Sequence, residues 1–167
     1  MKFSGSHGRA GRLAAWTVAL ALVGAPSASA QLLYGGHLAH ATDAFGGTTG
    51  VGARVGLGLP ALPIQLLAGV EYYFPGCSGA CGFQGLSVDG NVSLPFPFLA
   101  PYATGGWVLR RYDPHDEVEA ETFSGVHLGV GIGAGIAGAR VFGEARYEFV
   151  EAPERQLVLR AGFIIGG

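Results

Sequence analysis

Apolar side chains alternate with small or polar ones along most of the chain after residue 30, and this period of two constrains the fold more than any other feature. In residues 50–59 (GVGARVGLGL) the aliphatic side chains share one face of an extended segment, while Arg54 and the glycines share the other. In residues 64–74 the same alternation places Glu71 opposite an aliphatic face. Because successive side chains of a β-strand point to opposite faces, the pattern predicts strands.

Eight segments carry this alternation, the first of them weakly. They cover residues 31–40, 50–59, 64–74, 86–94, 99–110, 126–134, 140–149 and 157–165. No segment after residue 30 has the sustained 3.6-residue stripe of an amphipathic helix. We therefore expect an all-β fold of eight strands.

The connections between these segments alternate in length. Residues 41–47, 75–83, 113–121 and 151–155 form longer polar connections, whereas 60–63, 95–97 and 137–139 are short or rich in proline. Outer-membrane barrels have short periplasmic turns, longer extracellular loops and an even number of strands. A soluble β-sandwich shares the strand pattern but does not predict this sorting of loops. The sequence thus predicts an eight-stranded antiparallel transmembrane up-and-down β-barrel.

The first 30 residues have the layout of a secretory signal. Three basic side chains precede an apolar run at 13–24, and small residues follow at Ala28-Ser29-Ala30. The run is shorter than the roughly 20 residues that span a bilayer. We expect a cleavable signal peptide at 1–30 and a barrel domain at 31–167, with an uncleaved N-terminal anchor as the alternative.

A barrel that spans lipid turns its aliphatic face outward, so its polar face lines the interior. Four basic and four acidic residues fall on that inner face, and their charges balance. The interior of eight strands is only wide enough for side chains to fill it. We expect these residues to plug the lumen as a paired network, with a narrow pore as the alternative. The predicted network comprises Arg54, Glu71, Asp89, Arg110, Glu144, Arg146, Glu148 and Arg160.

Aromatic residues gather near the ends of the predicted strands, where amphipathic rings form girdles at the two membrane interfaces. We expect this role for Tyr72, Tyr73, Phe74, Phe96, Phe98, Tyr102, Trp107, Tyr147 and Phe149.

Two connections carry further candidate features. Cys77 and Cys81 lie in the second long connection, where an oxidising compartment favours a disulfide. Two thiols without a nearby histidine are too few ligands for a metal site. Residues 113–121 carry five carboxylates, which we expect to form a solvated acidic loop; cation binding there is the alternative. We predict no cofactor and no metal.

Two short motifs resemble a known family. Residues 101–107 (PYATGGW) resemble the fifth strand of the small eight-stranded outer-membrane barrels of the OmpX, OmpA transmembrane-domain and opacity-protein type, and residues 143–147 (GEARY) resemble the seventh. The last strand partly matches the assembly signal of such proteins, although Gly167 stands where they usually have Phe. The resemblance implies location in a bacterial outer membrane, contact with its lipid and lipopolysaccharide, and insertion by the assembly machinery.

Composition narrows the function. Residues 31–167 contain seven arginines, no lysine and twelve acidic residues, a net charge of about −5, so no basic surface is available for nucleic acid. We predict a monomeric, non-enzymatic outer-membrane barrel, structural or adhesive, whose extracellular loops contact host or other surface ligands. A lipid A-modifying enzyme is a further alternative, with His127 and Ser124, or His37 or His40, as its candidate residues. No G-x-S-x-G motif supports it.

Overall fold

The structure, a computed structural model, is a closed barrel of eight antiparallel strands in sequence order. It describes residues 30–42, 47–59, 62–74, 82–94, 99–113, 119–136, 139–150 and 155–166. The strands are β1 (Gln31–Ala41), β2 (Thr48–Leu59), β3 (Ile64–Phe74), β4 (Gly82–Ser93), β5 (Ala100–Asp113), β6 (Glu121–Ile136), β7 (Ala139–Val150) and β8 (Gln156–Ile165). The predicted all-β architecture and strand count are confirmed.

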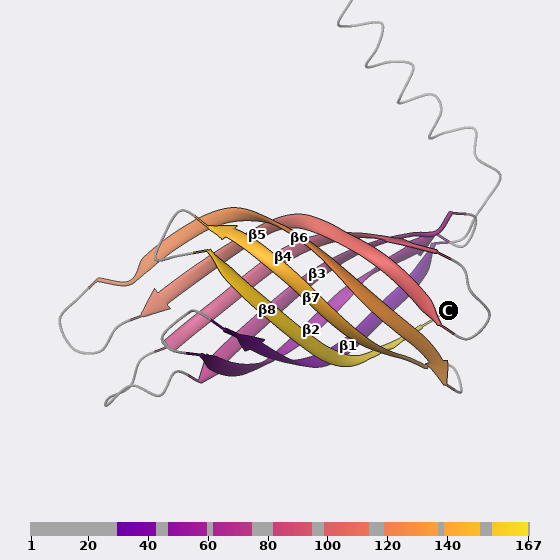
Figure 1. Cartoon of the computed structure of the whole chain (residues 1–167), viewed down its shortest axis with the longest axis horizontal. Helices are drawn as coiled ribbons and strands as arrows, with labels where there is room; N and C mark the ends of the chain where they lie inside the picture. Colours follow the sequence, from indigo (N-terminus) through magenta and orange to yellow (C-terminus); the bar gives the residue numbers. More distant parts are fainter. Residues whose placement is uncertain are drawn as a thin grey trace, which may run out of the picture.

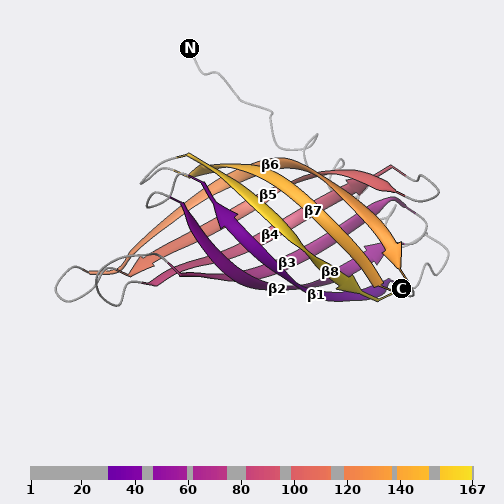
Figure 2. The ribbon, with the colours of Figure 1, turned by 60° about the horizontal axis from the view of Figure 1, so that its bottom comes forward.

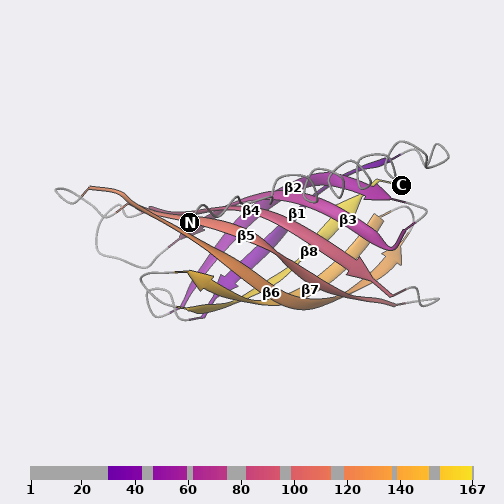
Figure 3. The ribbon, with the colours of Figure 1, turned by 90° about the horizontal axis from the view of Figure 1, so that it is seen from above.

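The barrel closes where β8 pairs with β1, in a register that aligns Arg160 with Ala39 and Gly162 with His37. Every other neighbouring pair is antiparallel and consecutive in the chain. The strands cross the long axis of the barrel obliquely (Figure 1). Turning the molecule brings β8 and β1 into view side by side (Figure 2), and the same elongated body is seen from above in Figure 3. Closure leaves no strand edge without a hydrogen-bonded partner.

The up-and-down order sorts the connections between the two ends of the barrel. β1, β3, β5 and β7 end at one end of the barrel, where the long connections 42–47, 75–81, 114–120 and 151–155 begin. β2, β4 and β6 end at the other, together with the start of β1 and the end of β8, which is at the right in Figure 1. The predicted difference in length does not hold for the connection 94–99, which is as long as 42–47 and longer than 151–155, because β4 ends at Ser93 and β5 begins only at Ala100. Among the described residues, no helix is long and apolar enough to cross a membrane.

The outward face is aliphatic over most of the barrel. Val130 is 65 % exposed and Leu128 is 64 % exposed, and similar side chains lie on every strand. An exposed apolar surface of this extent is unusual for a protein in water. It suits a barrel in lipid, where the backbone groups pair within the sheet and the apolar side chains contact the acyl chains.

Outward aromatic rings lie toward both ends of the barrel. Toward the long connections, the rings of Tyr72 and Phe74 pack edge to face with centroids 5.3 Å apart, and those of Tyr147 and Phe149 do so at 5.1 Å. Tyr34 near the start of β1 and Phe163 near the end of β8 are exposed at the opposite end. Two bands of this kind are what a bilayer with two interfaces favours.

The expected girdle is wrong at two positions. Tyr73 is 0 % exposed and Tyr102 is 7 % exposed, because both lie on the inward face of their strands. Side chains two residues apart in a strand share a face, so Tyr73 lies on the same inward face as Glu71. This alternation, and not closeness to a strand end, decides whether a ring faces lipid. Phe96 and Phe98 lie outside the described residues, as do Cys77, Cys81 and residues 1–29.

The depth of an outward residue should set the cost of placing a charge there. Val130 lies midway along the lipid-facing part of β6, whereas Thr122 lies near the start of that strand, toward the long connections. We expect Val130→Arg to lower the free energy of unfolding by about 2–4 kcal/mol and Thr122→Arg by about 0–1 kcal/mol. Equilibrium denaturation of the barrel refolded into lipid vesicles measures both. Equal costs at the two positions would contradict a membrane-spanning β6.

Candidate functional site

The inward face of the barrel concentrates ionisable side chains, and these form the candidate site. All eight residues of the predicted network are buried, with exposures between 0 % and 6 %. They project from six strands: Arg54 from β2, Glu71 from β3, Asp89 from β4, Arg110 from β5, Glu144, Arg146 and Glu148 from β7, and Arg160 from β8. The alternation of each strand therefore turns separate charges of both signs toward one axis.

Glu71 is the carboxylate on which this network converges. Arg110 Nη1 donates to Glu71 Oε2 at 2.7 Å, Arg146 Nη2 lies 3.3 Å from the same oxygen, and Arg160 forms an ion pair with Oε1. The Tyr73 hydroxyl donates to Oε2 at 3.0 Å, and His37 Nε2 lies 3.0 Å from Oε1. One carboxylate thus receives contacts from five side chains on four other strands and its own.

Arg146 occupies the centre of the network and has no exposed surface. Besides Glu71, its guanidinium lies 2.6 Å from Glu148 Oε1 and 3.3 Å from Asp89 Oδ1. Three carboxylates therefore surround this one cation. Buried charges are tolerated when they are paired and hydrogen-bonded. Arg146 donates to Asp89 and Glu71 through Nη1 and Nη2, whereas its Nε has no hydrogen-bond partner among the described residues.

Toward the long connections, Arg110 and Glu148 form a bidentate pair. Arg110 Nε donates to Glu148 Oε2 at 2.9 Å, and Nη2 donates to Oε1. Gln156 Nε2 donates to Glu148 Oε2 at 2.7 Å. The Arg110 guanidinium also lies 5.3 Å from the ring centroid of Tyr73 and 5.6 Å from that of Phe83. These rings make the pair part of a packed layer.

Toward the start of β1 and the end of β8, Glu144 contacts two cations and a phenol. Arg160 Nη1 donates to Glu144 Oε1 at 3.2 Å, and Arg54 Nη1 lies 3.7 Å from Oε2. The Tyr102 hydroxyl donates to Oε2 at 3.0 Å. The Arg54 guanidinium stacks 4.2 Å from the ring centroid of Phe142.

Apolar clusters lie on both sides of the charged layer. Ala39, Ala41, Tyr73, Phe83 and Val158 form the cluster nearer the long connections. Leu33, Leu67, Phe142 and Ile164 form the cluster nearer the start of β1 and the end of β8. Tyr73 and Phe83 of the first cluster contact Arg110, and Phe142 of the second contacts Arg54, so apolar side chains pack against the charged network toward both ends of the barrel.

Glycines make room for the largest inward side chains. Gly85 is the ladder partner of Arg110, and a Cβ at Gly85 would lie 1.7 Å from Arg110 Nη1. Gly131 is the partner of Tyr102, and a Cβ there would lie 2.2 Å from the phenol ring. A glycine directly opposite a long side chain therefore lets that side chain cross the narrow interior.

The sequence-based network omits several inward residues that contact it. These include His37, Tyr73, Tyr102 and Gln156, together with Ser87, which donates to Asp89, and His127, whose Nε2 lies 2.9 Å from Asp89 Oδ1. Parity alone places each of them except Gln156 on the polar face of a predicted strand. Among the described residues, no group of three or more His, Cys, Asp or Glu is arranged to hold a metal ion.

Comparisons with known proteins identify the fold. No family model matches the chain, and no curated protein matches it in sequence. Solved structures do match. The N-terminal β-barrel domain of OprF from Pseudomonas aeruginosa has a TM-score of 0.67 at 11 % identity, over 82 % of this chain and 97 % of that domain.

Two further matches have similar coverage. Neisserial surface protein A gives a TM-score of 0.60 at 15 % identity, over 81 % of this chain and 96 % of its own. Ail, the attachment invasion locus protein of Yersinia pestis, gives a TM-score of 0.57 at 9 % identity, over 83 % of this chain and 97 % of its own. These are eight-stranded outer-membrane barrels, so the predicted fold is confirmed.

The surroundings of Arg146 predict the cost of breaking the network. Arg146→Met removes a cation that faces three carboxylates, and removal of one partner of a buried pair typically costs about 3–5 kcal/mol. We expect the free energy of unfolding of this variant, measured by equilibrium denaturation, to fall by about 3–5 kcal/mol. Adding Glu148→Gln should recover part of it, because the carboxylate nearest the lost cation is then neutral.

The lipid-facing change Val130→Ala is the control for this experiment, and it should cost much less than Arg146→Met. Equal effects of Arg146→Met and Val130→Ala would mean that water solvates the interior charges.

Proposed function

We propose that this chain is a non-enzymatic outer-membrane barrel, structural or adhesive, whose lumen is plugged by its own side chains. The observation that carries the proposal is the convergence of three arginines on Glu71 between two apolar clusters. The four arginines and four carboxylates of the network balance in charge, so the network itself has no excess charge to attract an ion. The aliphatic exterior supports placement in a membrane.

A narrow pore is the second candidate, because the interior is lined by charged groups. Conduction requires sites that bind an ion weakly enough to release it, and a continuous wet path. The arginines and carboxylates here bind one another, which leaves them unavailable to a passing ion. The apolar clusters at both sides add barriers to water. The plugged barrel is therefore the better supported of the two.

The candidate catalytic residues of a lipid-modifying enzyme are not brought together. His127 faces the interior, whereas Ser124 is on the outward face of the same strand. His37 is committed to Glu71, and His40 lies 3.1 Å from Thr49 on the exterior. Within the lumen Asp89 lies between Ser87 and His127. A catalytic triad instead needs the histidine between the serine and the carboxylate.

In this proposal the long connections bind other molecules. Loops of a rigid scaffold carry binding residues disproportionately often. Two of the matched barrels are described as a surface protein and an attachment invasion locus protein. The proposal also includes removal of residues 1–30 on export and a disulfide between Cys77 and Cys81; residues 1–29 and both cysteines lie outside the described residues.

The plugged lumen predicts the electrical behaviour of the barrel. In planar bilayers the unmodified protein should give conductance near the baseline. The double variant Arg110→Ala with Glu148→Ala removes a bidentate pair without changing net charge, so any conductance should appear there. Stable ohmic conductance in the unmodified protein would make the pore the correct function.

The adhesive role predicts binding that depends on the loops. Cells that display the barrel should bind host cells or matrix proteins more than cells with an empty envelope. Replacing residues 114–118 and 76–81 by Gly-Ser linkers of equal length should abolish the difference. The variant barrel should still fold, so that it migrates faster in gel electrophoresis when unheated than when boiled. Shortening 60–63, at the other end, is the control and should leave binding unchanged. Binding that survives the loop replacements would contradict this role.

A further inference from the structure

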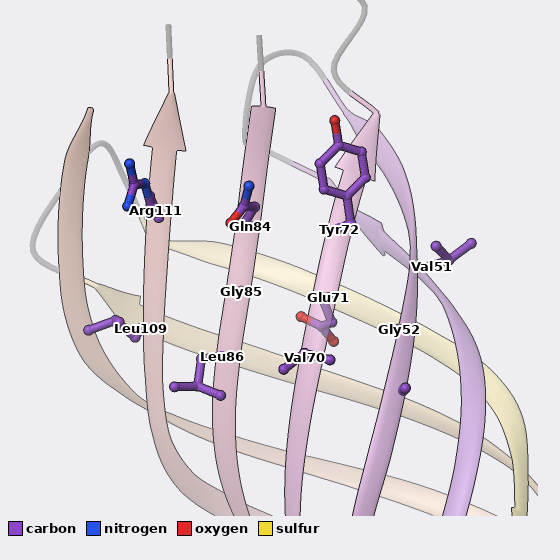
Figure 4. Close-up of a pocket in the computed structure, with 11 residues that line it drawn as sticks. Val51, Gly52, Val70, Glu71, Tyr72, Gln84, Gly85, Leu86, Leu109 and Arg111 are labelled. Carbon is purple, nitrogen blue, oxygen red and sulfur yellow. The ribbon is translucent and has the colours of Figure 1, made fainter. Parts of the chain in front are cut away.

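An open groove crosses the outer wall of the barrel over β2, β3, β4 and β5. Its volume is about 830 Å³, within the range of small-molecule sites. Figure 4 shows the side chains that line it, with Val70, Leu86 and Leu109 toward the middle of the strands. These three residues are ladder partners in one row, since Val70 pairs with Leu86 and Leu86 with Leu109. The groove therefore has a continuous aliphatic floor.

The next row toward the long connections is polar. Tyr72 pairs with Gln84, and Gln84 pairs with Arg111, so three outward polar side chains follow one another across β3, β4 and β5. In Figure 4 they lie beyond the aliphatic row, at the end of the groove. An outward arginine costs about 2–4 kcal/mol at the bilayer midplane but about 0–1 kcal/mol near an interface. The change between the two rows thus marks the level of the lipid headgroups.

Arg111 brings a positive charge to this level. Its side chain is 55 % exposed, and among the described residues it forms an ion pair with Asp113, which lies 4.0 Å away and is 52 % exposed. An exposed ion pair at this distance contributes little to stability. The guanidinium can therefore turn to an oxyanion of the lipid surface, and its planar fork matches a phosphate in a bidentate manner.

From this arrangement we infer that the groove is a binding site for an anionic phosphorylated lipid of the surrounding leaflet. One acyl chain lies on the row of Val70, Leu86 and Leu109, and the lipid phosphate contacts Arg111, with Gln84 and Tyr72 beside it as hydrogen-bonding groups. The site rests on the proposed placement of the barrel in a membrane. It is distinct from the lumen network, because the side chains proposed to contact the lipid are on the outward face, whereas Glu71, which also lines the groove, points inward.

The chain offers its own fluorescent reporter for this site. It has two tryptophans, and Trp16→Phe leaves Trp107 alone. Trp107 is outward on β5, two residues from Leu109, a separation of about 7 Å along a strand. Bromine atoms on the acyl chains of a lipid in the groove should quench its fluorescence. The probes are brominated phosphatidic acid and brominated phosphatidylcholine, each mixed into phosphatidylcholine vesicles that contain the refolded full chain.

We expect phosphatidic acid to bind about fivefold more strongly than phosphatidylcholine, the ratio for about 1 kcal/mol from one arginine at an anionic surface. Arg111→Gln should bring the ratio close to one, and Arg111→Lys should keep most of it. Arg155→Gln is the matched control: Arg155 is also exposed at the long-connection end, but between β7 and β8, away from the groove. This variant should leave the ratio unchanged.

Three results would overturn the inference. Equal quenching by the two lipids, or a preference that survives Arg111→Gln, would mean that Arg111 selects no phosphate. Weak quenching by both lipids that strengthens as the protein is diluted in the bilayer would mean that a second copy of the chain covers the groove. No quenching by either lipid would show that the barrel does not insert, which would also refute the proposed membrane location.

Discussion

Closure of the sheet through the pairing of β8 with β1 is the constraint on which the rest of the structure depends. Lipid offers no hydrogen bonds, so a sheet that spans a membrane must satisfy its backbone groups internally. Eight strands in sequence order achieve this with connections only between neighbours. Closure also fixes which face meets the lipid, and it sets the small diameter of the interior.

The small diameter explains the chemistry of the interior. Four arginines and four carboxylates project into a space that side chains fill, so each charge lies within reach of several opposite charges. Glu71 contacts three of the arginines, and Arg146 contacts three of the carboxylates. Glycines such as Gly85 and Gly131 provide the volume that these long side chains need. The charged network can therefore pack in the interior only because glycines lie opposite its longest side chains.

The exterior follows from the opposite requirement. The aliphatic rows face lipid, and polarity returns only where a strand reaches the membrane surface, as at Tyr72, Gln84 and Arg111. One strand can therefore serve two sites. In β5, Arg110 points inward and completes the network, while Arg111 points outward and carries the charge of the proposed lipid site.

The sequence by itself determined the eight strands and the face on which each side chain lies, because both depend on local alternation. Parity alone already assigned Tyr73 and Tyr102 to the interior, against their expected place in a girdle. Only the tertiary structure decided which charges meet. Glu71 contacts Arg110 and Arg146, 39 and 75 residues away, because tilted strands around a closed barrel bring side chains from distant strands to the same height on the axis. Alternation along one strand carries no information about that height.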